Sequence, residues 1–165
     1  MCIRDSGTVH TKIGDVFVVK LENGRKKYFQ LVVFDLTQLN SDVIRVFKTS
    51  YSEDNNCNLS EIINDEVDFY AHCVTKWGIQ LGFWEKVGKS LEVGNNDVLF
   101  RSSSDDPKTK ISDNWWIWKV NEQQQYVGKL EGENRLAEIG SVIPPDSIVY
   151  RINTGKYDFV YPEFE

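Results

Sequence analysis

The chain has 165 residues and a formal net charge of −6, which fits one acidic domain. This balance argues against non-specific binding to nucleic acid or to an anionic membrane, and it favours a basic protein surface as the partner. Aromatic residues make up 13% of the chain, which favours strands around a wide core over a helical bundle.

The cysteines and the N-terminus indicate the compartment. Cys2, Cys57 and Cys73 share no disulfide or metal spacing, and no apolar run reaches the roughly 18 residues of a membrane span. We therefore expect a cytoplasmic protein with no membrane partner. Residues 1–11 have neither a signal-peptide core nor the periodicity that follows, so we expect a disordered or artefactual leader before a single domain at 12–165.

From residue 12 onward the pattern predicts a three-stranded meander. Apolar and polar residues alternate over 13–21, and the turn Glu22-Asn23-Gly24 leads to a second strand at 27–34. An Asn-Gly pair between apolar runs is a strong hairpin signal. The β-branched run 43–47 predicts the third strand.

The rest of the chain predicts shorter elements. Polar stretches at 49–60 and 102–110 predict loops, and residues 59–63 could form one helical turn. Apolar runs predict further strands at 67–74, 98–101, 115–120 and 126–130, the last two as a hairpin. The segment 77–87 shows neither the periodicity of a helix nor that of a strand.

Residues 145–155 predict a helix, with Pro at its start, an acid in its first turn and Gly past its end. Together these elements predict an α+β fold. Its main part is a mostly antiparallel, bent and partly open barrel-like sheet, with one or two short helices.

One stretch of the chain, between Lys48 and Lys76, contains acids but no Lys or Arg. The acids are Glu53, Asp54, Glu61, Asp65, Glu66 and Asp68. Like charges within about one Debye length, roughly 8–10 Å, repel each other, so a partner of opposite sign is favoured and steered toward them. Solvation is the usual fate of such runs. Both interpretations stay open.

The tryptophans form a second candidate surface. Alternation over 115–118 places Trp116 and Trp118 on one face of a strand, with Trp115 and Ile117 on the other. A central strand covered on both sides explains this pattern. The alternative is that Trp116 and Trp118, with Trp84, form an exposed binding hot spot.

The residues that could carry chemistry are few. His72 and Cys73 are adjacent in a predicted strand and so point to opposite faces, which argues against a shared metal or a Cys–His nucleophile. No glycine-rich nucleotide motif occurs, and solvation explains the closely spaced Glu131 and Glu133 more simply than a glycosidase pair does. We expect no metal and no cofactor.

The segment KIGDVFVVKLENGRKKYFQLVVFD carries a family resemblance. Its start resembles that of the immunity protein 26 family of bacterial polymorphic toxin systems, which has a G-D-V/I-F strand, an Asn/Asp-Gly turn and a second strand with aromatics. The corresponding residues of this chain are Gly14, Asp15, Val16, Phe17, Gly24, Tyr28 and Gln30. Gly82-Phe83-Trp84 is similar to a later Gly-Phe/Leu-Trp pattern of the family. Arg25-Lys26-Lys27 stands where the family usually has small residues, and the last third of the chain has no counterpart.

The resemblance implies a non-enzymatic cytosolic protein that neutralises a cognate toxin by binding it, with no catalytic residues. A different class is a small-ligand enzyme, or a nucleotide- or glycan-binding domain, with a Trp-lined pocket. A further option is a protein that sequesters a small nucleotide, which requires cations in a pocket. The candidates for these cations are Arg101, Arg135 and Arg151.

Overall fold

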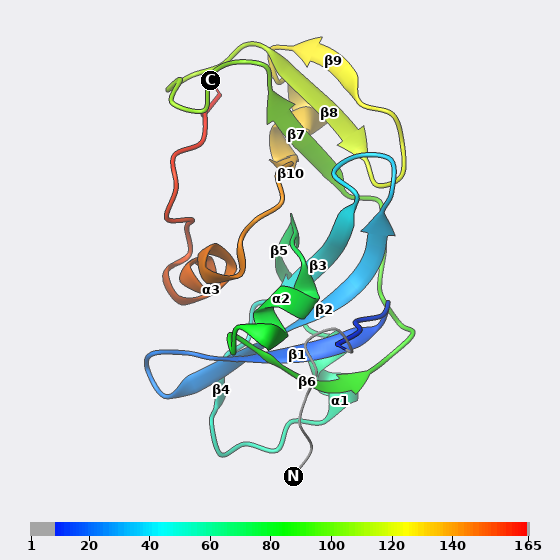
Figure 1. The fold of residues 1–165 in the computed structure, drawn as a ribbon, viewed down its shortest axis with the longest axis vertical. Helices are drawn as coiled ribbons and strands as arrows, with labels where there is room; N and C mark the ends of the chain where they lie inside the picture. Colours follow the sequence, from blue (N-terminus) through cyan, green and yellow to red (C-terminus); the bar gives the residue numbers. More distant parts are fainter. Residues whose placement is uncertain (1–8, 165) are drawn as a thin grey trace.

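The computed structural model describes residues 9–164, which form two β-sheets and three short α-helices (Figure 1). The strands of the larger sheet are β1 (Asp15–Lys20), β2 (Arg25–Asp35), β3 (Ser41–Phe47), β4 (Tyr51–Ser52), β5 (Val67–His72) and β6 (Glu85–Lys89). Those of the smaller sheet are β7 (Leu99–Ser103), β8 (Trp115–Lys119), β9 (Gln125–Gly128) and β10 (Glu138–Ile139). The helices are α1 (Leu59–Ile63), α2 (Thr75–Gln80) and α3 (Pro145–Thr154), and a 3-10 helix spans Gly132–Leu136.

The larger sheet confirms the predicted antiparallel meander. Its strand order is β5-β3-β2-β1-β6, and β4 pairs with the start of β2. Gly24 lies in the β1–β2 turn with φ +76°, a conformation that glycine adopts without the strain a side chain would bring. The predicted α+β class with mostly antiparallel strands is confirmed, and neither sheet closes into a barrel over residues 9–164.

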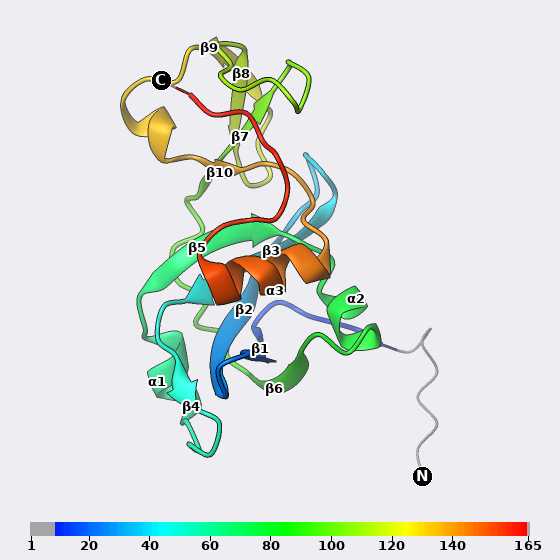
Figure 2. The same ribbon diagram turned by 90° about the vertical axis from the view of Figure 1, so that its left-hand side faces the viewer.

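Alternating side chains give the larger sheet two buried faces. On one face Phe17, Phe29 and Ile44 belong to a cluster with Ile148 and Ile152 of α3, which lies across the strands (Figure 2). The period of two residues along each strand accounts for this separation of faces.

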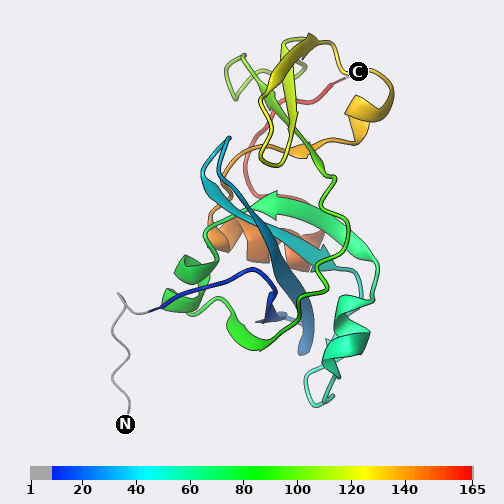
Figure 3. The same ribbon diagram turned by 90° about the vertical axis from the view of Figure 1, so that its right-hand side faces the viewer.

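The opposite face of the larger sheet is covered by other segments. Val16, Tyr28 and Phe47 pack there with Ile62 and Ile63 of α1. The connection from β6 to β7 runs along the molecule toward the smaller sheet (Figure 3). Both faces of the central strands are therefore closed to solvent.

The smaller sheet depends on the end of the chain for its cover. Its order is β10-β7-β8-β9, and only the β10–β7 pair is parallel. The segment after α3 returns to this sheet (Figure 2), where Tyr161 and Phe164 pack near Trp115 of β8. This explains why a short run of aromatics follows the last helix.

A substitution in α2 tests the close packing of this helix against Trp84. A Cβ atom built on Gly78 would lie 1.9 Å from the Trp84 ring. Helix propensity alone favours alanine by about 1 kcal/mol, whereas overpacking of a core costs about 1–3 kcal/mol. Gly78→Ala should therefore lower the free energy of unfolding, measured by urea denaturation. Exposed Lys76→Ala in the same helix is the control, and a stabilised Gly78→Ala variant would contradict this packing.

Candidate functional site

The fold brings lysines to the acidic stretch that the sequence alone does not reveal. Lys20 at the end of β1 lies 3.7 Å from Glu53, and Lys48 lies 3.2 Å from Glu66. Asp65 accepts hydrogen bonds from the backbone N–H groups of Thr49 and Glu66, both at 2.8 Å. These exposed pairs stabilise little, but they reduce the charge that a partner meets.

Three exposed acids of the original set are not neutralised by an ion pair. Asp54, Glu61 and Asp68 have no ion pair within the described part of the chain. Lys26 from β2 donates to the carbonyls of Glu53 and Asn55, so the loop is also held against the β1–β2 hairpin. The acidic stretch is therefore a partly neutralised surface rather than a uniform one.

A groove beside β5 gathers acids from distant segments. Its volume is about 530 Å³, and its carboxylates belong to Asp68, Asp97, Glu133 and Glu138. The cation in its lining, Lys119, is held by Asp97 at 2.7 Å. We call this groove, with its four acids, the acidic groove. Sequence reasoning missed it as a unit because the four acids come from separate parts of the chain.

Apolar side chains share this groove. Val67, Leu99 and Leu136 line it, and Leu136 is 81% exposed. Leu136 ends the 3-10 helix that follows Leu130 and Glu131, a segment whose structure the sequence did not indicate. Acidic and apolar groups together suit a partner surface with a basic rim and an apolar anchor.

Glu138 lies at the inner side of the groove. Burial raises the pKa of its carboxyl, while a hydrogen bond from the backbone N–H of Tyr70 and the charges of Arg151 and Arg101 act in the opposite direction. The carboxyl is thus tied to β5 and is less available to a partner than exposed Asp68 and Glu133.

The structure places two of the three candidate tryptophans in the core. Trp84 is 2% exposed, and its indole N–H donates to the Thr75 carbonyl at 2.9 Å. Trp118 is 3% exposed. Of the three candidates, Trp116 is partly accessible, with its N–H bonded to Ser104 and its ring edge against Tyr126. The covered-strand interpretation thus describes Trp118, because β8 lies between neighbours and packs toward the larger sheet.

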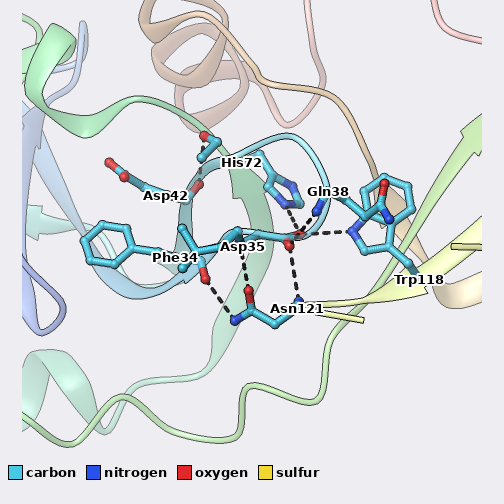
Figure 4. A network of polar contacts seen from close by, with 9 residues as sticks. Phe34, Asp35, Gln38, Asp42, His72, Trp118 and Asn121 are labelled. Carbon is cyan, nitrogen blue, oxygen red and sulfur yellow. Dashed lines mark hydrogen bonds and ion pairs between the residues drawn. The ribbon is translucent and has the colours of Figure 1, made fainter. Parts of the chain in front are cut away.

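Trp118 belongs to a buried polar network centred on Asp35 (Figure 4). The Asp35 carboxylate accepts hydrogen bonds from His72 Nε2 at 2.9 Å and Trp118 Nε1 at 3.0 Å. It also accepts bonds from the backbone N–H groups of Asn121 and Gln38, both at 3.2 Å. These donors come from both sheets and from the β2–β3 turn.

The His72–Asp35 pair resembles an acid–base pair, but no substrate can reach it. Both side chains are 0% exposed. Burial lowers the pKa of His72 against the opposing effect of Asp35, and the pKa of Asp35 is lowered because its four hydrogen bonds outweigh burial. The contact is therefore a hydrogen bond from a neutral imidazole to a carboxylate, and its role is structural.

Within residues 9–164, the structure supports neither a reactive site at Cys73 nor a metal site. Cys73 is buried, and burial raises the pKa of its thiol, which opposes reactivity. Over residues 9–164, no three side chains of His, Cys, Asp or Glu come together as a metal would require. No helix in that range is long and apolar enough to cross a membrane.

A comparison with protein families decides the affiliation. The model of the family described as immunity protein 26 matches residues 12–112, more than half of the chain. The chain belongs to the immunity protein 26 family. The match covers the larger sheet and β7 and ends before β8 and α3. No curated protein and no solved structure matches this immunity protein. Membership in the family indicates a toxin-neutralising binding role, and such proteins are generally non-enzymatic.

The network around Asp35 predicts unequal roles for two tryptophans. Trp118→Phe removes one of the four donors to a buried carboxylate, which should lower the free energy of unfolding by about 1–3 kcal/mol. Trp116→Phe, the matched control, should change it by less than about 1 kcal/mol because Trp116 is partly exposed. Chemical denaturation measures both. Equal effects would argue against a special role for the Asp35 contact.

The same network predicts a pH dependence of stability. The pKa of folded His72 lies below its ordinary 6.5, so below that pH the unfolded chain binds a proton that the folded chain does not. The free energy of unfolding should therefore fall as pH drops through 6.5, by at most about 1.4 kcal/mol per unit from this group. Asp35 adds a further loss below its ordinary 3.8.

His72→Gln is the control for this pH dependence, because it keeps an N–H donor and removes the titrating group. Its stability should vary less between pH 7 and pH 5 than that of the natural chain. Parallel profiles for the two proteins would exclude His72 as the cause.

Proposed function

We propose that this immunity protein neutralises a bacterial toxin by binding it directly in the cytoplasm, and that it catalyses no reaction. The family match over residues 12–112 carries the proposal. A net charge of −6 supports a basic toxin domain as the partner, since opposite charge speeds encounter and suppresses wrong partners.

The acidic groove is the part of the surface that best fits such a toxin. Asp68 and Glu133 are exposed, and neither has an ion pair within the described part of the chain. Leu136 offers an apolar contact beside them. Asp68 is the last acid of the acidic stretch, and we include the exposed Asp54 and Glu61 of that stretch in the proposed contact surface.

A Trp-lined enzyme pocket has less support. Trp118 is buried, and Trp84, although 2% exposed, lines a cavity of about 670 Å³. That lining has a single carboxylate, Glu85, rather than the two acids that a glycosidase needs. The buried His72–Asp35 pair is out of reach of any substrate. A stoichiometric binding protein needs none of these features.

Co-expression tests the function. The probe is a toxin domain identified by sequencing the genes that flank this chain's gene, and it is produced from an inducible promoter in a bacterial host. We expect growth arrest without the immunity protein, recovery with it, and a stable one-to-one complex in gel filtration. Recovery without a complex would contradict neutralisation by direct binding, and so would a complex that leaves the toxin active.

Charge reversal tests the interface with three variants of equal charge change. Asp68→Lys/Glu133→Lys alters the groove, Asp54→Lys/Glu61→Lys alters the acidic stretch, and exposed Glu85→Lys/Asp113→Lys is the control. The groove variant should slow association with the toxin domain by about tenfold or more at low salt and flatten its salt dependence. The acidic-stretch variant should act in the same direction, and the control should not.

Surface plasmon resonance at two salt concentrations measures these rates. If the groove variant associates as fast as the control, the groove is not the interface. If the acidic-stretch variant alone is slow, the contact lies beside α1 instead. Circular dichroism of each variant verifies that all three remain folded.

A further inference from the structure

A second cavity carries the opposite charge. Its volume is about 460 Å³, and it lies between β7, β10, α3 and the segment that follows α3. Three cations line it, Arg101, Arg151 and Lys156, against the two carboxylates of Glu138 and Glu163. In a chain with a net charge of −6, a net positive cavity is a local exception that solvation alone does not explain.

Arg151 is held by rings rather than by an acid. Its guanidinium carbon lies 3.9 Å from the ring centroid of Phe69 and 4.7 Å from that of Tyr157. Over residues 9–164, none of the ion pairs within 4 Å includes an arginine. Stacking of this kind uses the flat face of the guanidinium. One in-plane contact goes to the Tyr157 hydroxyl, and the guanidinium has further N–H donors for an anion.

Arg101 is placed in a similar way. It lies over the rings of Trp115 at 5.5 Å and Phe164 at 5.0 Å, and one of its terminal N–H groups donates to the Ala137 carbonyl. Its Nε atom is buried and has no hydrogen-bond partner within the described residues. A buried donor without a partner is costly, and an acceptor supplied by a ligand would satisfy it.

The two acids of the cavity cancel these charges only in part. The carboxyl of Glu138 is tied to the backbone N–H of Tyr70, and Glu163 is exposed. Neither lies within 4 Å of Arg101 or Arg151 as an ion pair. The two guanidinium groups and the Lys156 ammonium therefore retain an excess of positive charge toward the cavity.

Aromatic side chains form another part of the lining. Tyr157 and Phe159 stack with centroids 4.9 Å apart at 20°, and Tyr161 meets Phe159 edge-on at 6.5 Å. Flat rings beside guanidinium groups suit a ligand that joins a planar ring to an anionic group. The volume falls within the roughly 300–1,000 Å³ typical of small-ligand sites.

We propose that this cavity binds a nucleoside monophosphate or a ligand of the same chemistry. The phosphate contacts Arg101, Arg151 and Lys156, and the base lies against the aromatic residues of the C-terminal segment. Apart from Arg101, the lining lies beyond the segment that matches the family model. The site is therefore an addition to the toxin-binding role and does not depend on it.

Calorimetric titration of the full chain with the four ribonucleoside 5′-monophosphates tests the site. At least one should bind with a Kd between about 10 μM and 1 mM, while its nucleoside and inorganic phosphate each bind at least about tenfold more weakly. Arg151→Gln should abolish the binding, and Lys156→Gln should weaken it by about fivefold or more. Lys156 is exposed, so its variant remains folded even if Arg151→Gln does not.

Arg135→Gln is the matched control. Arg135 also lies over the Phe164 ring, at 5.6 Å, but it is exposed and does not line the cavity. Its variant should bind the nucleotide as the natural chain does. The proposal is overturned if none of the four nucleotides binds at about 1 mM, if phosphate alone binds as tightly, or if Lys156→Gln leaves binding unchanged.

Discussion

The position of the two sheets depends on one buried carboxylate. Asp35 ends β2 in the larger sheet and accepts hydrogen bonds from His72 of β5 and Trp118 of β8. A buried charge is tolerated only when its lone pairs are satisfied, and here four N–H groups do so. Around this polar centre Val32, Val43, Phe100 and Trp118 form a shared apolar cluster, so the joint between the sheets is both packed and hydrogen-bonded.

This joint determines where the two cavities lie. The acidic groove combines β5 of the larger sheet with Leu99 and the 3-10 helix beside the smaller one. The cationic cavity combines Arg101 of the smaller sheet with α3, which packs on the larger one. Glu138 lines both, and its carboxyl binds the backbone of Tyr70. A shift of one sheet against the other would therefore alter both surfaces, although their proposed ligands differ in charge.

Local sequence signals predicted most of the elements but not their meeting points, and they gave no indication of α2, β6 or the 3-10 helix. The Asn23-Gly24 turn, the alternation over 115–118 and the Pro and Gly at the ends of α3 were enough for the hairpins and the helix. The pairing of Asp35 with His72 spans 37 residues, and no period or motif marks it. The acidic stretch looked uniform because Lys20 and Lys48 lie outside it in sequence, while the hairpin brings them next to it. Arg101 and Arg151 were recognised as candidates, but only the fold shows that they share one cavity.

Hydrogen–deuterium exchange of the immunity protein, alone and bound to the toxin domain used in the co-expression test, tests the central claim most directly. If the toxin docks in the acidic groove, amide exchange should slow over residues 67–70, 95–99 and 133–138, which line it. Peptides over α3 and residues 155–163 should change little, because they lie on the other cavity. Unchanged exchange around the groove, with protection elsewhere, would contradict the account.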